Sequence, residues 1–165
     1  MSVLLASCQP ELGGERVNFA GTQAIAALIE KVWDFIMDLH QVGPCMPGFK
    51  AVEVIDPQTF KVRVGVGIAA VKATFTMDVR MVELEPPTRA TGKAHGMAPG
   101  SAVDITSAMS LREAGAGTTT MQWSADVVVS GTLASLGARL LHSTAQKMTA
   151  QFFTCVQEKL EAPSA

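Results

Sequence analysis

Between residues 50 and 130 the chain alternates apolar and polar side chains, and this alternation constrains the fold more than any other feature. In its clearest run, polar residues separate Val71, Ala73, Phe75, Met77, Val79 and Met81. Successive side chains of a β-strand point to opposite faces, so the pattern predicts strands with one buried face. Turn residues divide the segment into about six strands with short connections, as in an antiparallel meander. They are Asp56-Pro57, Gly67, Pro86-Pro87, Pro99-Gly100 and residues 115–117.

The flanking segments predict helices and one more strand. Residues 17–23 suit a short strand, and residues 26–39 have helical apolar spacing. Glycines and prolines between residues 43 and 48 leave room for at most a short second helix. Residues 132–160 contain no proline and predict one long amphipathic helix.

These elements predict a single α+β domain. We expect a curved antiparallel sheet of about seven strands wrapped around a long C-terminal helix, with two short helices after the first strand. The domain is expected to cover residues 17–160. Residues 1–16 are expected to form a flexible N-terminal tail and residues 161–165 a C-terminal tail.

The predicted inward faces contain no ionisable side chain in four strands. Besides the run above, they comprise Phe60, Val62, Val64 and Val66; Val103, Ile105, Ser107, Met109 and Leu111; and Met121, Trp123, Ala125, Val127 and Val129. General acid–base catalysis needs a titratable group close to the substrate. Methionine-rich apolar faces instead suit a flexible apolar ligand, although the same pattern also fits an ordinary filled core.

The histidines are the remaining candidates for polar chemistry. His95 lies in a strand whose two faces are hard to distinguish, because Ala90, Gly92, Ala94 and Gly96 are all small. Facing inward, His95 could donate a hydrogen bond to a ligand carbonyl; facing outward, it would be solvated. His40 and His142 have no metal-ligand partners at useful spacing, so neither a metal nor a covalent cofactor is expected.

The net charge bears on whether nucleic acid is a partner, and the cysteine content bears on the redox state of the compartment. The net charge is −2 and no basic cluster is present, so nucleic acid is not an expected partner. Cys8, Cys45 and Cys155 are odd in number and far apart, which favours free thiols in a reducing, cytoplasmic setting. The residues ending at Cys8 resemble a lipoprotein cleavage box, but they lack a preceding basic residue and a long apolar run.

Several short motifs together resemble one known family. They are Val32-Trp33-Asp34-Phe35 with Asp38, Cys45-Met46-Pro47-Gly48, Val71-Lys72-Ala73-Thr74-Phe75, Pro86-Pro87, Gly100-Ser101-Ala102, residues 133–140 and Gln151-Phe152-Phe153. As a set, covering about residues 17–160, the chain resembles the carbon monoxide dehydrogenase subunit CoxG, within the START and Bet v 1-like (SRPBCC) superfamily.

The resemblance implies a helix-grip fold with an apolar cavity between the sheet and the long helix. It also implies an elongated lipophilic ligand such as a quinone or lipid, and a partner that is a molybdenum hydroxylase of the carbon monoxide dehydrogenase type. The expected location is cytoplasmic, with transient contact at the inner face of the membrane. The expected ligand-binding residues are Val64, Val66, Phe75, Met77, His95, Met109, Met121, Trp123, Leu140 and Met148.

Two departures from the family pattern qualify this picture. The family commonly has Gly-Pro where this chain has Ala69-Ala70. Many members also continue into an apolar tail after the terminal helix, whereas this sequence ends at Ala165, so a shuttle is expected and not a fixed anchor.

Two alternatives stay open: a small-molecule cyclase, dehydratase or hydrolase with His95 inside near Ser107 or Thr91, and a structural adaptor with a filled core.

Overall fold

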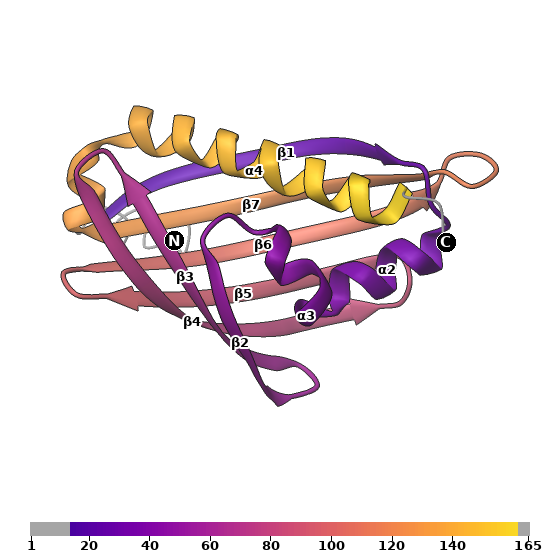
Figure 1. Cartoon of the computed structure of the whole chain (residues 1–165), viewed down its shortest axis with the longest axis horizontal. Helices are drawn as coiled ribbons and strands as arrows, with labels where there is room; N and C mark the ends of the chain where they lie inside the picture. The colour runs from indigo at the N-terminus through magenta and orange to yellow at the C-terminus, as the bar shows by residue number, and fades with distance from the viewer. Residues whose placement is uncertain (1–13, 162–165) are drawn as a thin grey trace, which may run out of the picture.

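The computed structural model describes residues 14–161 and contains a seven-stranded antiparallel sheet (Figure 1). The strand order is β1-β7-β6-β5-β4-β3-β2, so the first strand pairs with the last and the other neighbours follow the chain as a meander. The strands are β1 (Gly14–Ile25), β2 (Phe49–Asp56), β3 (Thr59–Ile68), β4 (Val71–Glu85), β5 (Arg89–Ala98), β6 (Ser101–Glu113) and β7 (Thr119–Gly131).

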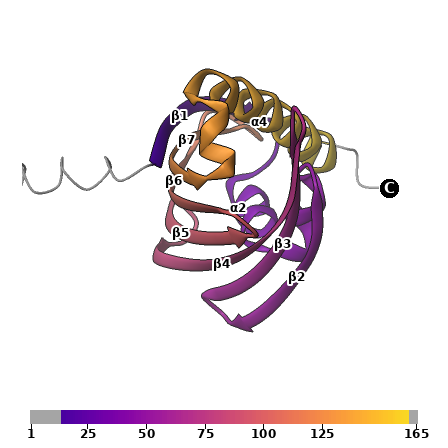
Figure 2. The same ribbon diagram turned by 90° about the vertical axis from the view of Figure 1, so that its left-hand side faces the viewer.

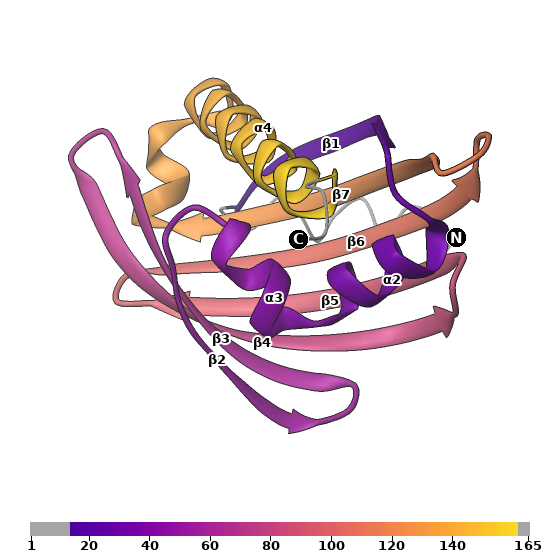
Figure 3. The ribbon, with the colours of Figure 1, turned by 45° about the vertical axis from the view of Figure 1, so that its right-hand side comes forward.

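The helices lie on the concave side of this curved sheet (Figures 2 and 3). Three short elements connect β1 to β2, and two elements follow β7. They are α2 (Ile29–Met37), α3 (Leu39–Val42) and the 3-10 helix η2 (Gly43–Cys45), then the 3-10 helix η3 (Thr132–Leu136) and the long α4 (Ala138–Glu161). No helix within residues 14–161 combines the length and apolar character needed to cross a membrane.

Two apolar clusters form the core along the concave face. The first joins α2 and the C-terminal half of α4 to the sheet through residues that include Val32, Trp33, Met121, Phe153 and Val156. The second lies where β3 and β4 meet η3 and the start of α4, and it includes Phe60, Val62, Val64, Phe75, Met77, Leu133 and Leu141. The apolar strand faces that alternation predicted to be buried are therefore packed in one cluster or the other.

The predicted α+β class and the helix gripped by a curved sheet are confirmed. The element boundaries differ in two places. β1 begins at Gly14, three residues before the expected start, and it extends to Ile25 by pairing with β7 along its whole length. The rest of the expected N-terminal tail and residues 162–165 lie outside the described residues.

The prediction of one unbroken helix over residues 132–160 is wrong at its start. Gly137 has φ of 87°, in the left-handed region that glycine tolerates, and it separates η3 from α4. α4 therefore begins at Ala138. This shift changes which leucines of the segment face the sheet.

Candidate functional site

A cavity of about 430 Å³ lies between the concave face of the sheet and the middle of α4. This volume falls in the range usual for small-molecule sites, roughly 300–1,000 Å³. The walls come from α2, the segment after η2, strands β4 to β7, and α4. The lining residues are Ile36, Met37, Met46, Pro47, Met81, Ala90, Gly92, Ser107, Ala108, Met109, Met121, Trp123, Ser124, Ala125, Met148, Thr149, Phe152 and Phe153.

The helical side of the cavity follows from the 3.6-residue period of α4. Met148 and Phe152 are one turn apart, and Thr149 and Phe153 form the adjacent row, so all four face the sheet side of the helix. The rings of Trp123 and Phe153 have centroids 5.6 Å apart, which joins β7 to α4 at the cavity wall. Phe152 and Phe153 contact each other edge to face at 5.2 Å.

Large side chains of the sheet lie against glycines of the neighbouring strands. A Cβ placed on Gly21 of β1 would be 2.9 Å from Nε1 of Trp123, and one on Gly92 of β5 would be 3.3 Å from Sδ of Met81. A Cβ on Gly96 would collide with the side chain of Met77. In each pair the two residues are direct neighbours across the ladder. Absence of a Cβ therefore gives these side chains room against the sheet.

The cavity is uncharged. None of the described residues that line it is ionisable, and the hydroxyl groups among them belong to Ser107, Ser124 and Thr149. Ser107 is exposed although it shares its face with partly buried Ile105 and Met109, as expected beside an open space. The indole Nε1 of Trp123 is buried and has no hydrogen-bond partner among the described residues. It is packed against β1, where a Cβ on Gly21 would lie 2.9 Å from it, so this unpaired donor, which costs about 1–3 kcal/mol, lies on the sheet side of the indole.

The structure places four of the expected ligand-binding residues in this cavity: Met109, Met121, Trp123 and Met148. It places Val64, Phe75 and Met77 in the second core cluster, with Val66 packed against that cluster. Alternation identified their inward direction correctly. It could not show that η3 and the start of α4 cover them, whereas the cavity lies further along the sheet.

Leu140 does not line the cavity, contrary to expectation. It is 38% exposed, while the next residue, Leu141, is buried in the second cluster. α4 begins only after Gly137. Within it, neighbouring side chains are turned by about 100° from each other, so Leu141 faces the sheet while Leu140 faces solvent. The lining residues Ile36, Met37, Phe152 and Phe153 were not expected there. The apolar faces of their helical segments were the available signal.

His95 lies on the convex face of the sheet, so its expected position at the ligand is wrong. Its Nδ1 is 2.6 Å from Oδ1 of Asp104 on β6, and its ladder neighbour on the other side is Asp78. Ala90 and Gly92 of the same strand line the cavity, and alternation then directs His95 outward. The cyclase or hydrolase alternative thereby loses its proposed general base.

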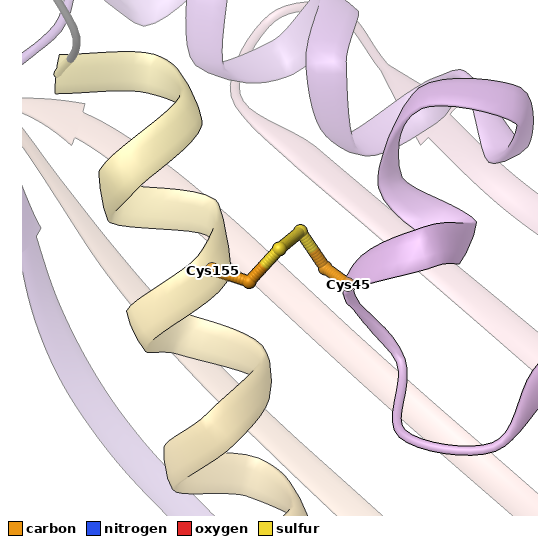
Figure 4. Close-up of a disulfide and its surroundings, with 2 residues drawn as sticks. All are labelled: Cys45 and Cys155. Carbon is orange, nitrogen blue, oxygen red and sulfur yellow. A yellow bond between two sulfur atoms is a disulfide. The ribbon is translucent and has the colours of Figure 1, made fainter.

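Cys45 and Cys155 form a disulfide (Figure 4), so the prediction of free thiols is wrong for these two residues. Their Cα atoms are 5.3 Å apart, a normal disulfide separation, although 110 positions separate them in sequence. Cys8 lies outside the described residues. Disulfides are uncommon in reducing compartments, so the cysteine pattern no longer supports a cytoplasmic location.

Comparison with known proteins is consistent with this geometry. The family model of the carbon monoxide dehydrogenase subunit CoxG matches residues 21–161. A search of curated proteins finds no significant match.

Several solved structures share the fold. A conserved protein from Geobacillus kaustophilus has a TM-score of 0.82 and 24% identity, covering 88% of this chain and 95% of that one. The ZhuI aromatase/cyclase from Streptomyces sp. R1128 has a TM-score of 0.68 and 17% identity, covering 89% and 94%. A START superfamily protein from Mycobacterium smegmatis has a TM-score of 0.69 and 13% identity, covering 89% and 99%.

Proposed function

Because the chain belongs to the CoxG family of carbon monoxide dehydrogenase subunits, we propose that it binds an elongated, uncharged lipophilic molecule, with a quinone favoured. The observation that carries this proposal is the cavity of about 430 Å³ whose described lining residues include no ionisable group. The ligand is held without a covalent bond and exchanged with the protein's partners.

The chemistry of the wall favours a neutral head group over a charged one. Transfer of a carboxylate or ammonium group into an apolar site is costly unless a counter-charge is present. The cavity offers hydroxyl donors, which suit a carbonyl oxygen. A quinone combines two carbonyl oxygens with an apolar ring and tail.

Binding is proposed in preference to catalysis for the same reason. A general acid or base has to lie within hydrogen-bond reach of the reacting group. The described cavity wall provides hydroxyl, thioether, aromatic and aliphatic groups, and His95 is on the opposite face of the sheet. Methionines at several points of the wall can adapt to the ligand as it enters and leaves.

We assign the partner by family membership. A molybdenum hydroxylase of the carbon monoxide dehydrogenase type releases electrons that a quinone can accept, and a protein that shields the quinone could carry it between this enzyme and the membrane. The two-electron, two-proton reduction of quinone to quinol takes place at the partner enzyme. The role of this chain is to bind and deliver.

The test measures quinone retention. Lipid-free protein is incubated with ubiquinone-2, separated from free quinone by gel filtration, and extracted for mass spectrometry. Near-stoichiometric retention is expected for the wild type. Met148→Trp should fill the cavity and abolish retention, whereas Leu140→Trp, two turns away on the exposed face of α4, should leave it intact.

Absence of retention in the wild type would refute the proposal, as would equal losses in the two variants. The partner role is tested separately. Purified carbon monoxide dehydrogenase with carbon monoxide should reduce quinone supplied in the wild-type complex faster than quinone supplied with Met148→Trp.

A further inference from the structure

A second apolar pocket of about 180 Å³ lies between the helical segment and the β2–β3 hairpin. Trp33 and Leu39 form one side, Pro57 and Phe60 the hairpin side, and Leu84 and Pro86 the end near β5. Every described residue that lines it is apolar. The backbone N–H of Met81 donates to the carbonyl oxygen of Gln58 at 2.8 Å, which fastens the hairpin tip to β4 beside the pocket.

The second pocket and the main cavity share part of their walls. Ile36, Met37 and Met81 line both. Two of these three residues are methionines, whose unbranched side chains change shape at low cost. Met81 lies closely over Gly92, where a Cβ would be 3.3 Å from its Sδ, so its side chain occupies the room left by the missing Cβ. The partition between the two pockets is therefore made of adaptable side chains.

We propose that the second pocket is an annex for the distal end of the ligand's apolar chain, which passes between Met37 and Met81 while the head group stays in the main cavity. This inference rests on the function proposed above. The polarity of the walls sets the orientation. The main cavity carries the hydroxyl groups of Ser107 and Thr149, whereas no described residue of the annex carries a hydroxyl, amide or charged group.

The chain contains two tryptophans, and the structure places one in each pocket: Trp123 in the main cavity and Trp33 in the annex. Trp33→Phe and Trp123→Phe thus give proteins with a single fluorescent reporter each. The probes are methyl stearates with a doxyl quencher at carbon 5, near the head, or at carbon 16, near the end of the chain.

The annex predicts opposite quenching orders. Trp123 should be quenched more by the carbon-5 label, and Trp33 more by the carbon-16 label. The same order at both tryptophans overturns the annex while leaving binding in the main cavity intact. If neither tryptophan is quenched and the protein retains no probe, both the annex and the proposed function are overturned.

A blocking variant tests the annex with both tryptophans in place. Leu84→Phe should fill it, and Val82→Phe, two residues away and 49% exposed, is the matched control. Across ubiquinones with one to four isoprene units, the wild type and Val82→Phe should bind more tightly as the tail lengthens, by about fourfold per buried methylene at most. Leu84→Phe should bind the shortest ubiquinone normally and lose this gain. An unchanged chain-length dependence in Leu84→Phe overturns the annex.

Discussion

Cys45 and Cys155 are covalently joined, and each adjoins residues of the cavity wall. Cys45 precedes Met46 and Pro47, and Cys155 follows Phe152 and Phe153. The bond therefore holds together two walls that come from segments 110 residues apart. Because both segments contact the same space, the disulfide supports the site as well as the fold.

Reduction of this disulfide should lower the stability of the protein substantially. Chain-entropy estimates for a loop of this length reach about 4.7 kcal/mol, and typical values are about 2–4 kcal/mol. Urea unfolding with and without reductant measures the change in the free energy of unfolding. The double variant Cys45→Ala with Cys155→Ala is the control and should not respond to reductant. Superimposable wild-type curves under the two conditions would contradict the expectation.

Ala69→Gly should stabilise the protein. Ala69 has φ of 54°, in the left-handed region that is unfavourable for residues with a Cβ, and it lies in the β3–β4 turn. Glycine removes the backbone strain at this position but adds conformational entropy to the unfolded chain. We expect the first effect to be larger, so the free energy of unfolding should rise by about 0.5–1 kcal/mol. Ala70→Gly, without a positive φ, should be neutral or destabilising. Equal effects of the two substitutions would argue against strain at Ala69.

Gly96→Ala should destabilise the sheet more than Gly92→Ala. A Cβ at Gly96 would collide with Met77 and lie 2.9 Å from Cγ1 of Val103, a stiff β-branched neighbour. At Gly92 the nearest atom is the flexible Met81 Sδ, at 3.3 Å. Overpacking of this kind costs about 1–3 kcal/mol, and that range is expected for Gly96→Ala alone. Denaturant midpoints of the two variants give the comparison, and an equal or reversed order would contradict it.

Asp38 should make stability depend on pH in the acid range. A hydrogen bond from the Gln41 side chain, 2.8 Å long, is the main cause that lowers the pKa of Asp38 below its ordinary 3.8, and backbone N–H groups of His40 and Gln41 add to it. A lowered folded-state pKa stabilises the protein above the unfolded pKa, and this contribution is lost as the pH falls through the folded pKa.

The stability difference between wild type and Asp38→Asn should therefore be constant near neutral pH and shrink below pH 3.8. Urea unfolding across this range measures it. Gln41→Ala removes the main cause and should move the loss toward higher pH. A difference that stays constant down to complete acid unfolding would show that the pKa of Asp38 is not lowered.

His95→Ala should leave quinone retention unchanged. Its ring pairs with Asp104 on the convex face, where its side chain is 49% exposed, and the sheet separates it from the cavity. The retention assay described above gives the measurement, with Met148→Trp as the variant that loses binding. Loss of retention in a folded His95→Ala protein would mean that a site on the convex face contributes to binding.

Sequence reasoning succeeded where side-chain alternation carries a strong signal. The faces of β3, β4 and β7 are apolar on one side and polar on the other, and the structure orients them as expected. In β5 the inward residues are alanine and glycine, so alternation had almost no contrast and the orientation of His95 stayed open. Small inward residues are what a cavity requires, and they weaken the pattern that would locate it.

Contacts between distant segments could not be predicted in the same way. The pairing of Cys45 with Cys155 depends on how α4 crosses the sheet, which no local pattern encodes. Gly137 looked compatible with a continuous apolar repeat, yet its positive φ delays the start of α4 and turns Leu140 to solvent. Assignment of the lining residues thus needed the position of this helix.

The contacts of Trp123 with Gly21 and of Met81 with Gly92 bear on how ligand size could diverge among related proteins. Each large side chain has room against the sheet because its neighbour has no Cβ, so the depth of the cavity depends on two positions where a side chain is missing. An exchange at either position would make the cavity shallower while every methionine and aromatic residue of the wall stayed the same. Relatives with identical large lining residues could then accept molecules of different thickness.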